Sequence, residues 1–133
     1  QLPAYPPVDE PKTGRLSGSR SGTQVVLEIP DDGLARYVAF RNAEEETVLT
    51  CYIRAGDTGR VRLPQGQYYL LVGVGDVWYG PQHLFGEGAQ YSKTDYCGVP
   101  SKDYLYTLTL QPAVDIVDGI PIYDVGLDDI LGT

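Results

Sequence analysis

The sequence predicts an all-β fold, an antiparallel β-sandwich of the immunoglobulin-like or jelly-roll-like kind with one long Gly- and Tyr-rich loop. Several segments alternate apolar and polar residues with a period of two, which is typical of strands. Turn signals separate these segments at intervals of roughly eight to twelve residues, as in sandwiches and small barrels. No window carries a sustained helical period of apolar residues. The 16 Gly, 10 Pro and 11 Tyr residues also favour strands and turns over helices.

Each predicted strand ends at a turn signal. The segment 24–29 is followed by Pro, two Asp and Gly, and residues 44–46, all glutamate, form the expected tip of a hairpin. The segment 67–74 is apolar on both faces, so we expect a central strand between two layers. The predicted strands are 24–29, 36–42, 47–54, 60–63, 67–74 and 104–110.

The 133 residues are enough for one domain with a core of its own. Residues 1–22 are rich in Pro, Gly and Ser and are interpreted as a linker, either a stalk or a chain end without fixed structure. Residues 23–112 form the predicted sandwich domain. Residues 113–133 mix acidic and apolar side chains, and we expect this extension to pack on the domain rather than pair with another chain. Because the sequence has no Met, we expect a processed or excised product from which a targeting or anchoring segment has been removed.

Charge limits the class of partner. The chain has 10 Lys and Arg against 18 Asp and Glu, a net charge of −8. Such a chain repels phosphate backbones and anionic lipid surfaces, so neither nucleic acid nor a membrane surface is an expected partner. No apolar run approaches the length of a bilayer span, so no membrane insertion by this stretch of chain is expected. The oligomeric state is left open.

The two cysteines, Cys51 and Cys97, bear on the cellular compartment in which the protein acts. Cys51 shares a strand face with Leu49 and Ile53, so its side chain is predicted to point inward. An even count without a CxxC pair favours a disulfide between them, which would stabilise the fold by about 4 kcal/mol. Two buried thiols are the alternative. A disulfide would indicate an oxidising, extracytoplasmic location. With a single His, a zinc site is not expected, and neither is another metal or a cofactor.

Nucleophilic catalysis is not predicted. His83 is the only histidine, with Ser92 and Ser101 as conceivable nucleophiles and Asp76 or Asp95 as orienting groups. No GxSxG elbow is present, and a small sandwich with short hairpins offers little cleft. A histidine that packs in a loop is the favoured interpretation, and the chain is predicted not to be an enzyme.

Aromatic residues supply the candidate binding site. They lie in or beside the expected long loop of residues 80–99, where rings with flat apolar faces suit a sugar or a protein partner. The alternative, which we favour, is that the rings cover the open end of a small core and that nearby glycines let the loop fold over it. The candidates are Trp78, Tyr79, Phe85, Tyr91 and Tyr96.

Several motifs carry a resemblance. They are RAGDT at 54–58, LPQGQY at 63–68, GDVWYG at 75–80, LFG at 84–86 and YSK at 91–93. With them, residues 13–111 resemble a small β-rich domain that recurs in bacterial, largely gut-associated, surface and membrane-anchored proteins of unknown function. The resemblance implies a β-rich fold and a position after an anchor or linker, and it implies no activity. The two cysteines are not expected in most relatives.

Together these observations predict a non-catalytic, extracytoplasmic bacterial domain, secreted or anchored to the cell surface. Its expected role is protein interaction or structural display, with a protein or a glycan at the cell surface as partner. The alternative is a carbohydrate-binding module that uses the loop aromatics.

Overall fold

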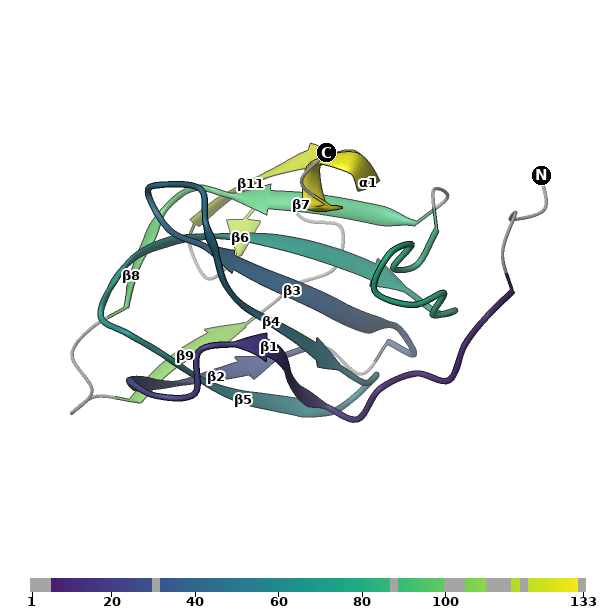
Figure 1. The fold of residues 1–133 in the computed structure, drawn as a ribbon, viewed down its shortest axis with the longest axis horizontal. Helices are drawn as coiled ribbons and strands as arrows, with labels where there is room; N and C mark the ends of the chain where they lie inside the picture. The colour runs from purple at the N-terminus through teal and green to yellow at the C-terminus, as the bar shows by residue number, and fades with distance from the viewer. Residues whose placement is uncertain are drawn as a thin grey trace.

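The computed structural model describes residues 6–29, 32–86, 89–99, 105–109, 116–117 and 120–131. Within them the strands form two sheets that pack face to face, one of eight strands and one of three, and a single short helix follows the last strand (Figure 1). The chain is an all-β sandwich, as the sequence predicts. The immunoglobulin-like or jelly-roll-like subtype stays a prediction.

The larger sheet is antiparallel throughout and is built around β6, whose long apolar run is buried on both faces. Its order is β1-β4-β3-β6-β7-β11-β10, and β8 pairs with the first residues of β6. Its strands are β1 (Gly14–Gly18), β3 (Ala35–Arg41), β4 (Thr47–Ile53), β6 (Gly66–Gly75), β7 (Gln90–Thr94), β8 (Cys97–Val99), β10 (Ile116–Val117) and β11 (Ile120–Val125).

The smaller sheet has the order β5-β2-β9. Here β2 (Thr23–Glu28) pairs antiparallel with β5 (Thr58–Leu63), but it pairs parallel with β9 (Leu105–Thr109). The expectation of a wholly antiparallel fold is therefore wrong for this one pair. The ends of the predicted strand 104–110 lie outside the described residues.

The main core lies between the two sheets. Strand alternation sends every second side chain of β2, β3, β4, β5 and β6 into this layer. Cys51 joins Leu49 and Ile53 there, on the inward face that the sequence indicates. The fully buried aliphatic and aromatic members include Val25, Leu27, Val38, Phe40, Leu49, Ile53, Leu63 and Leu70.

One charged side chain is also fully buried, Arg36 of β3. Its terminal nitrogens donate to the two carboxylate oxygens of Asp32 at 2.9 and 3.0 Å, and one of them also donates to the Leu34 carbonyl at 2.8 Å. The hydrogen bond from Arg36 holds the pKa of Asp32 below its usual value. A bidentate pair of this kind is how a buried guanidinium is tolerated.

A second core covers the outer face of the larger sheet. It contains the other alternate residues of β3, β4 and β6, among them Tyr37, Tyr52 and Leu71. The turn from Trp78 to Phe85 and the helix α1 (Leu127–Leu131) lie over this face, and each contributes buried side chains (Figure 1). Both faces of the larger sheet are therefore apolar, which is why so few of its residues alternate with polar ones.

The expected long loop at residues 80–99 is a loop only in part, because eight of its twenty residues form strands. After the turn, the chain returns to the sheet as β7 and β8, which pair with successive parts of β6. At the break between them, the Leu70 N–H donates to Thr94 Oγ1 at 3.0 Å, so a side chain replaces the missing backbone partner. These strands are short and interrupted, and their Gly and Tyr content predicts a turn-rich stretch instead.

The interpretation of residues 1–22 as a linker is wrong for part of that segment. Residues 14–18 form β1, the edge strand of the larger sheet, with a register shift between Arg15 and Ser17. Ser17 and Thr50 hydroxyls lie 2.6 Å apart across the strand pair, and Leu16 packs against the second core. The sequence of this strand is too polar and Gly-rich to identify it by pattern. Residues 1–5 lie outside the described residues.

The C-terminal extension contributes β11 and α1. β11 pairs antiparallel with β7, and Ile130 of α1 is buried in the second core. Arg41 of β3 donates to the Ile130 carbonyl at 2.9 Å and ties the helix end to the sheet. Residues 113–115, 118–119 and 132–133 of the extension lie outside the described part. Within the described residues, no helix has the length and apolar character needed to span a membrane.

The predicted disulfide between Cys51 and Cys97 is wrong, because both cysteines are free thiols. Cys51 on β4 and Cys97 on β8 are both buried on the inter-sheet face, but β3 and β6 lie between their strands. Three strand spacings put their backbones about 14 Å apart, whereas a disulfide needs Cα atoms within about 7 Å. Burial raises the pKa of Cys51 to about 12. The alternative of two buried thiols holds, and the location argument from a disulfide falls away.

Candidate functional site

The turn from Trp78 to Gly86 is a compact structure held by its own backbone. The Tyr79 N–H donates to the Leu84 carbonyl at 2.8 Å, and the Leu84 N–H donates to the Gly80 carbonyl at 2.7 Å. Leu84 is fully buried and has a φ of 52°, a left-handed conformation that non-glycine residues seldom adopt. Its burial and both hydrogen bonds hold it there, so the turn is rigid enough to position the rings on either side.

Trp78 lies inside a group of aromatic rings. The Tyr37 ring is stacked on it, with centroids 6.1 Å apart and planes inclined by 28°. Tyr52 and Phe85 meet it edge-on, with centroids at 5.0 and 5.4 Å. Only 6% of Trp78 is exposed. A sugar therefore has no open indole face on which to stack in this arrangement.

Two glycines of β6 make room for the rings. A Cβ added to Gly75 would lie 2.5 Å from Phe85 Cβ, and one added to Gly73 would lie 2.9 Å from the Tyr91 ring. The Tyr91 hydroxyl donates to the Gly86 carbonyl and accepts from the Phe85 N–H at 3.2 Å. The two glycines of this strand, Gly73 and Gly75, thus leave room for two aromatic side chains.

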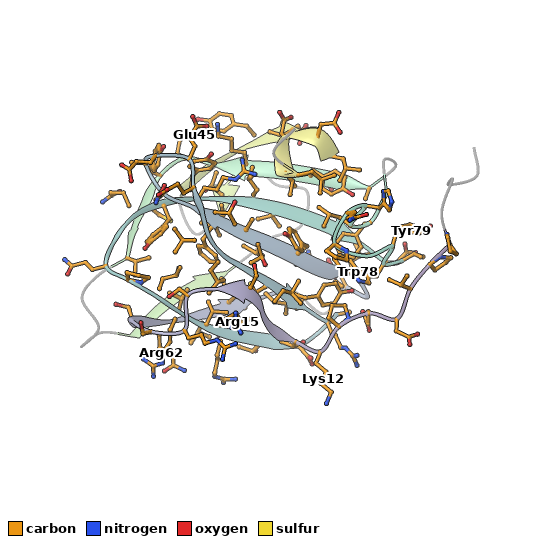
Figure 2. All side chains as sticks on the ribbon, in the orientation of Figure 1. Lys12, Arg15, Glu45, Arg62, Trp78 and Tyr79 are labelled. Atoms are coloured by element: carbon orange, nitrogen blue, oxygen red, sulfur yellow. The ribbon has the colours of Figure 1, made fainter. Side chains whose placement is uncertain are left out.

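The structure separates the five predicted site residues into two groups. Trp78, Phe85 and Tyr91 come together in the second core and are nearly inaccessible. Tyr79, half-buried, lies beside Trp78 at the same end of the molecule (Figure 2). Tyr96 is 49% exposed and contacts Tyr69 edge-on at 5.3 Å, at the other end of β6. The five therefore do not form one stacking platform.

A groove of about 540 Å³ opens beside Trp78. Tyr37 and Trp78 contribute aromatic surface to it, Val8, Pro11, Leu16 and Pro81 contribute aliphatic surface, and Asp9, Ser17 and Thr50 are its polar members. We refer to it as the Trp78 groove. It has the size and the mainly apolar lining of ligand and partner sites.

One wall of the Trp78 groove is the segment 8–11, and several bonds fix it. The Val8 N–H donates to the Trp78 carbonyl at 2.9 Å. The Tyr52 hydroxyl donates to Glu10 at 2.7 Å, and Arg54 Nε donates to the Pro11 carbonyl at 2.8 Å. The interpretation of residues 1–22 as a linker missed this role, because the four residues 8–11, of which only Val8 is a large apolar residue other than proline, carry no periodic signal.

The groove holds few charges at neutral pH. Burial, and then the hydrogen bond to Glu10, raises the pKa of Tyr52, and burial raises the pKa of Tyr37. Both phenols are therefore neutral. Among the residues that line the groove, Asp9 is the one acidic or basic side chain. The arrangement suits an apolar or aromatic side chain more than a strongly charged ligand.

The conceivable catalytic residues that lie in the described part of the chain are not brought together. Ser92 pairs with Val72 and is buried on the inter-sheet face of the larger sheet, whereas His83 belongs to the turn that covers the opposite face. Asp95 is exposed and accepts a hydrogen bond from the Tyr123 hydroxyl at 3.1 Å. Ser101 lies outside the described residues. In the described part of the chain, no group of three or more His, Cys, Asp or Glu side chains is placed to hold a metal ion.

Comparison with known proteins adds no assignment. The chain matches no protein-family model and shows no significant similarity to curated proteins or to solved structures. The resemblance drawn from the sequence motifs therefore stays an expectation.

Proposed function

We propose that this chain is a non-catalytic bacterial domain that acts outside the cytoplasm and binds a partner protein through the Trp78 groove. The observation that carries the proposal is the groove itself, an apolar hollow with aromatic walls and a polar rim on a chain whose net charge is −8. The extracytoplasmic part of the proposal rests on the motif resemblance.

The chemistry of the groove favours a protein over a sugar. Protein interfaces combine an apolar, aromatic centre with a polar rim, which is the distribution of Trp78, Tyr37 and Leu16 against Asp9 and Ser17. Sugar sites need an open ring face, and the indole face is occupied by Tyr37. An aliphatic or aromatic side chain of a partner would fill the hollow and leave the rim hydroxyls and the Asp9 carboxylate to bond its backbone.

The separation of the candidate catalytic residues supports the non-catalytic part of the proposal. The single histidine and the buried serine lie on opposite faces of the larger sheet, so they cannot act on one substrate atom. Asp76 and Asp95, the two candidates for a group that orients the histidine, are both exposed.

A displayed peptide library is a direct test of the groove. We expect peptides selected on the wild-type domain to carry an apolar or aromatic anchor and to lose at least tenfold in affinity on Ser17→Arg, which fills the rim from an exposed position. The matched control is Gln65→Arg, an equal change of charge at the exposed β5–β6 turn. Equal loss for both variants, or selected peptides that ignore Ser17→Arg, would contradict the proposal.

A second candidate is glycan binding, and one observation favours it. Tyr96 and Tyr123 are the two most exposed tyrosines for which exposure is described, at 49% and 51%; Asp95 directly precedes Tyr96 in the chain and accepts a hydrogen bond from the Tyr123 hydroxyl. Flat exposed rings beside a carboxylate are what a sugar platform uses. A glycan array on wild type and Tyr96→Ala tests it. Specific binding that disappears in the variant supports this candidate, and binding unchanged by the variant contradicts it.

A further inference from the structure

A second hollow lies on the opposite side of β1 from the Trp78 groove, and arginines dominate it. Its volume is about 240 Å³, and four of the seven arginines of the chain line it. We call it the arginine pocket. Its lining polar residues are Arg15, Ser19, Arg20, Gln24, Arg60 and Arg62.

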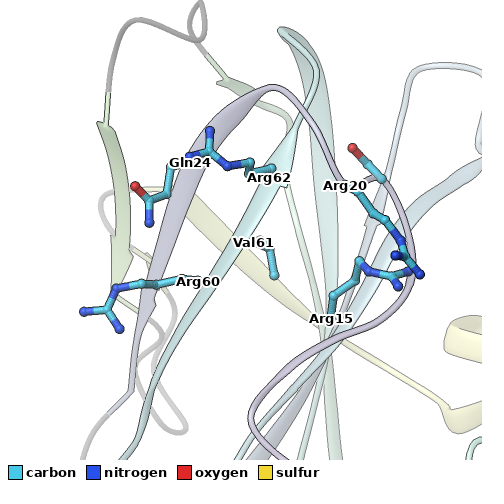
Figure 3. Close-up of a pocket in the computed structure, with 7 residues that line it drawn as sticks. Arg15, Arg20, Gln24, Arg60, Val61 and Arg62 are labelled. Carbon is cyan, nitrogen blue, oxygen red and sulfur yellow. The ribbon is translucent and has the colours of Figure 1, made fainter.

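These side chains come from two different parts of the fold. Arg15 and Arg20 belong to β1 and the connection that follows it, and they lie on one side of the hollow (Figure 3). Arg62 and Gln24 are register partners on β5 and β2 and lie on the other side, with Arg60 extending outward at the far rim. The pocket therefore sits where the edge strands of the two sheets, β1 and β5, approach each other.

The backbone around the pocket is closely packed. An added Cβ at Gly18 or Gly22 would lie 2.1 Å from a backbone carbonyl oxygen of Val48 or Leu63, so this connection is pressed onto β4 and β5. Arg15 donates to the Gly18 carbonyl at 3.2 Å, and Arg62 donates to the Gly22 carbonyl at 2.9 Å. The guanidinium groups are thus positioned in part before any ligand arrives.

The charges of the pocket are not neutralised by the part of the chain that the structure describes. There, none of the four arginines has a carboxylate within 4 Å, whereas Arg36 and Arg54 each have one. Arg20 and Arg60 make no side-chain hydrogen bond to a described residue. In a chain with 18 acidic residues, four arginines that share a hollow without acidic partners leave most of their donors available to an anion.

Protection of a sheet edge from pairing with other chains could also explain two of the four arginines. β5 pairs on one side alone, and charged side chains on an edge strand prevent pairing with other chains. That role accounts for Arg60 and Arg62. It does not account for Arg15 and Arg20, which come from another segment and face the same hollow.

We propose that the arginine pocket binds a compact tetrahedral oxyanion, the sulfate or phosphate group of a small molecule or of a single sugar residue. Guanidinium groups recognise such oxygens by paired hydrogen bonds. A pocket of about 240 Å³ admits the group and little more of the molecule that carries it. A long polyanion does not fit, because beyond these four arginines the chain carries 18 acidic against six basic residues. This site is independent of the proposed function at the Trp78 groove.

The test is an NMR titration of the labelled domain at constant ionic strength, with sodium sulfate, inorganic phosphate, glucose 6-phosphate and N-acetylglucosamine 6-sulfate as probes and sodium chloride as reference. We expect saturable shifts confined to the lining residues. Saturation by the free ions and the esters alike assigns the site to the oxyanion itself, and saturation by one ester alone assigns it to a ligand that carries the group. No saturation by any probe overturns the proposal.

Two charge-matched variants complete the experiment. Arg20→Gln removes a pocket charge that makes no described hydrogen bond, so the fold is unaffected, and we expect affinity to fall roughly tenfold. Lys12→Gln removes an exposed charge outside the pocket and should leave affinity within twofold. Equal losses in both variants would reveal a net-charge effect and overturn the proposal. So would binding of heparin more tightly than of the sulfated monosaccharide.

Discussion

Gly75→Ala tests the packing that closes the outer face of the larger sheet. The added methyl would lie 2.5 and 2.6 Å from Cβ and Cγ of Phe85, whereas ordinary contacts are about 3.5–4.0 Å. Phe85 cannot withdraw easily, because it is 94% buried and its N–H is bonded to the Tyr91 hydroxyl. A shift of about 1 Å is needed, and overpacking of this kind costs about 1–3 kcal/mol.

The backbone itself does not oppose the substitution. Gly75 is not among the described glycines with positive φ, so alanine is allowed there and would by propensity alone stabilise the strand by about 0.5–1 kcal/mol. The net expectation is a loss of about 1–2 kcal/mol in the free energy of unfolding, or about 4–8 °C in Tm for a domain of this size.

Urea unfolding followed by Trp78 fluorescence measures this loss, since the indole belongs to the same cluster. The matched control is Gly98→Ala in β8, where the added methyl meets only the flexible amide end of the exposed Gln67 side chain at 3.0 Å. We expect that control to be neutral or slightly stabilising. If Gly75→Ala were as stable as the wild type, Phe85 could not lie over this strand as described.

Three further outcomes are expected. Arg36 lowers the pKa of Asp32, so the ion pair contributes its full stabilisation above the usual carboxyl pKa and loses it as the pH falls through the lowered pKa. Asp32→Asn should therefore lower the free energy of unfolding by about 3 kcal/mol at pH 7. A plot of this free energy against pH should also fall less steeply on the acid side in the variant than in the wild type. Cys51 and Cys97 should resist alkylation in the native protein, because both thiols are buried. Mass spectrometry should find both cysteines alkylated in urea without a reductant. Alkylation only after reduction would show that the two cysteines form a disulfide. Trp78 emission should be blue-shifted and insensitive to iodide, and strong quenching would contradict its burial.

The sequence was sufficient for the elements whose faces differ. In β2 and β5 the more buried and less buried positions alternate along the strand and the residues show it, as with Val61 between Arg60 and Arg62. The all-β class, five of the strands close to their observed bounds, and the inward face of Cys51 follow from that period. The local sequence determines these features, because a strand that is buried on one face has apolar residues at every second position.

The tertiary structure decided what depends on neighbours distant in the chain. β1 and the segment 8–11 are polar and Gly- or Pro-rich, and they are ordered by partners about forty residues away, such as Tyr52 for Glu10. The distance between the cysteines depends on the strand order, which alternation leaves undetermined. The arginine pocket likewise forms only because β1 and β5 are brought edge to edge. The alternation of apolar and polar residues in a strand indicates which face each side chain occupies. Only the packing of the sheets determines which residues that face contacts.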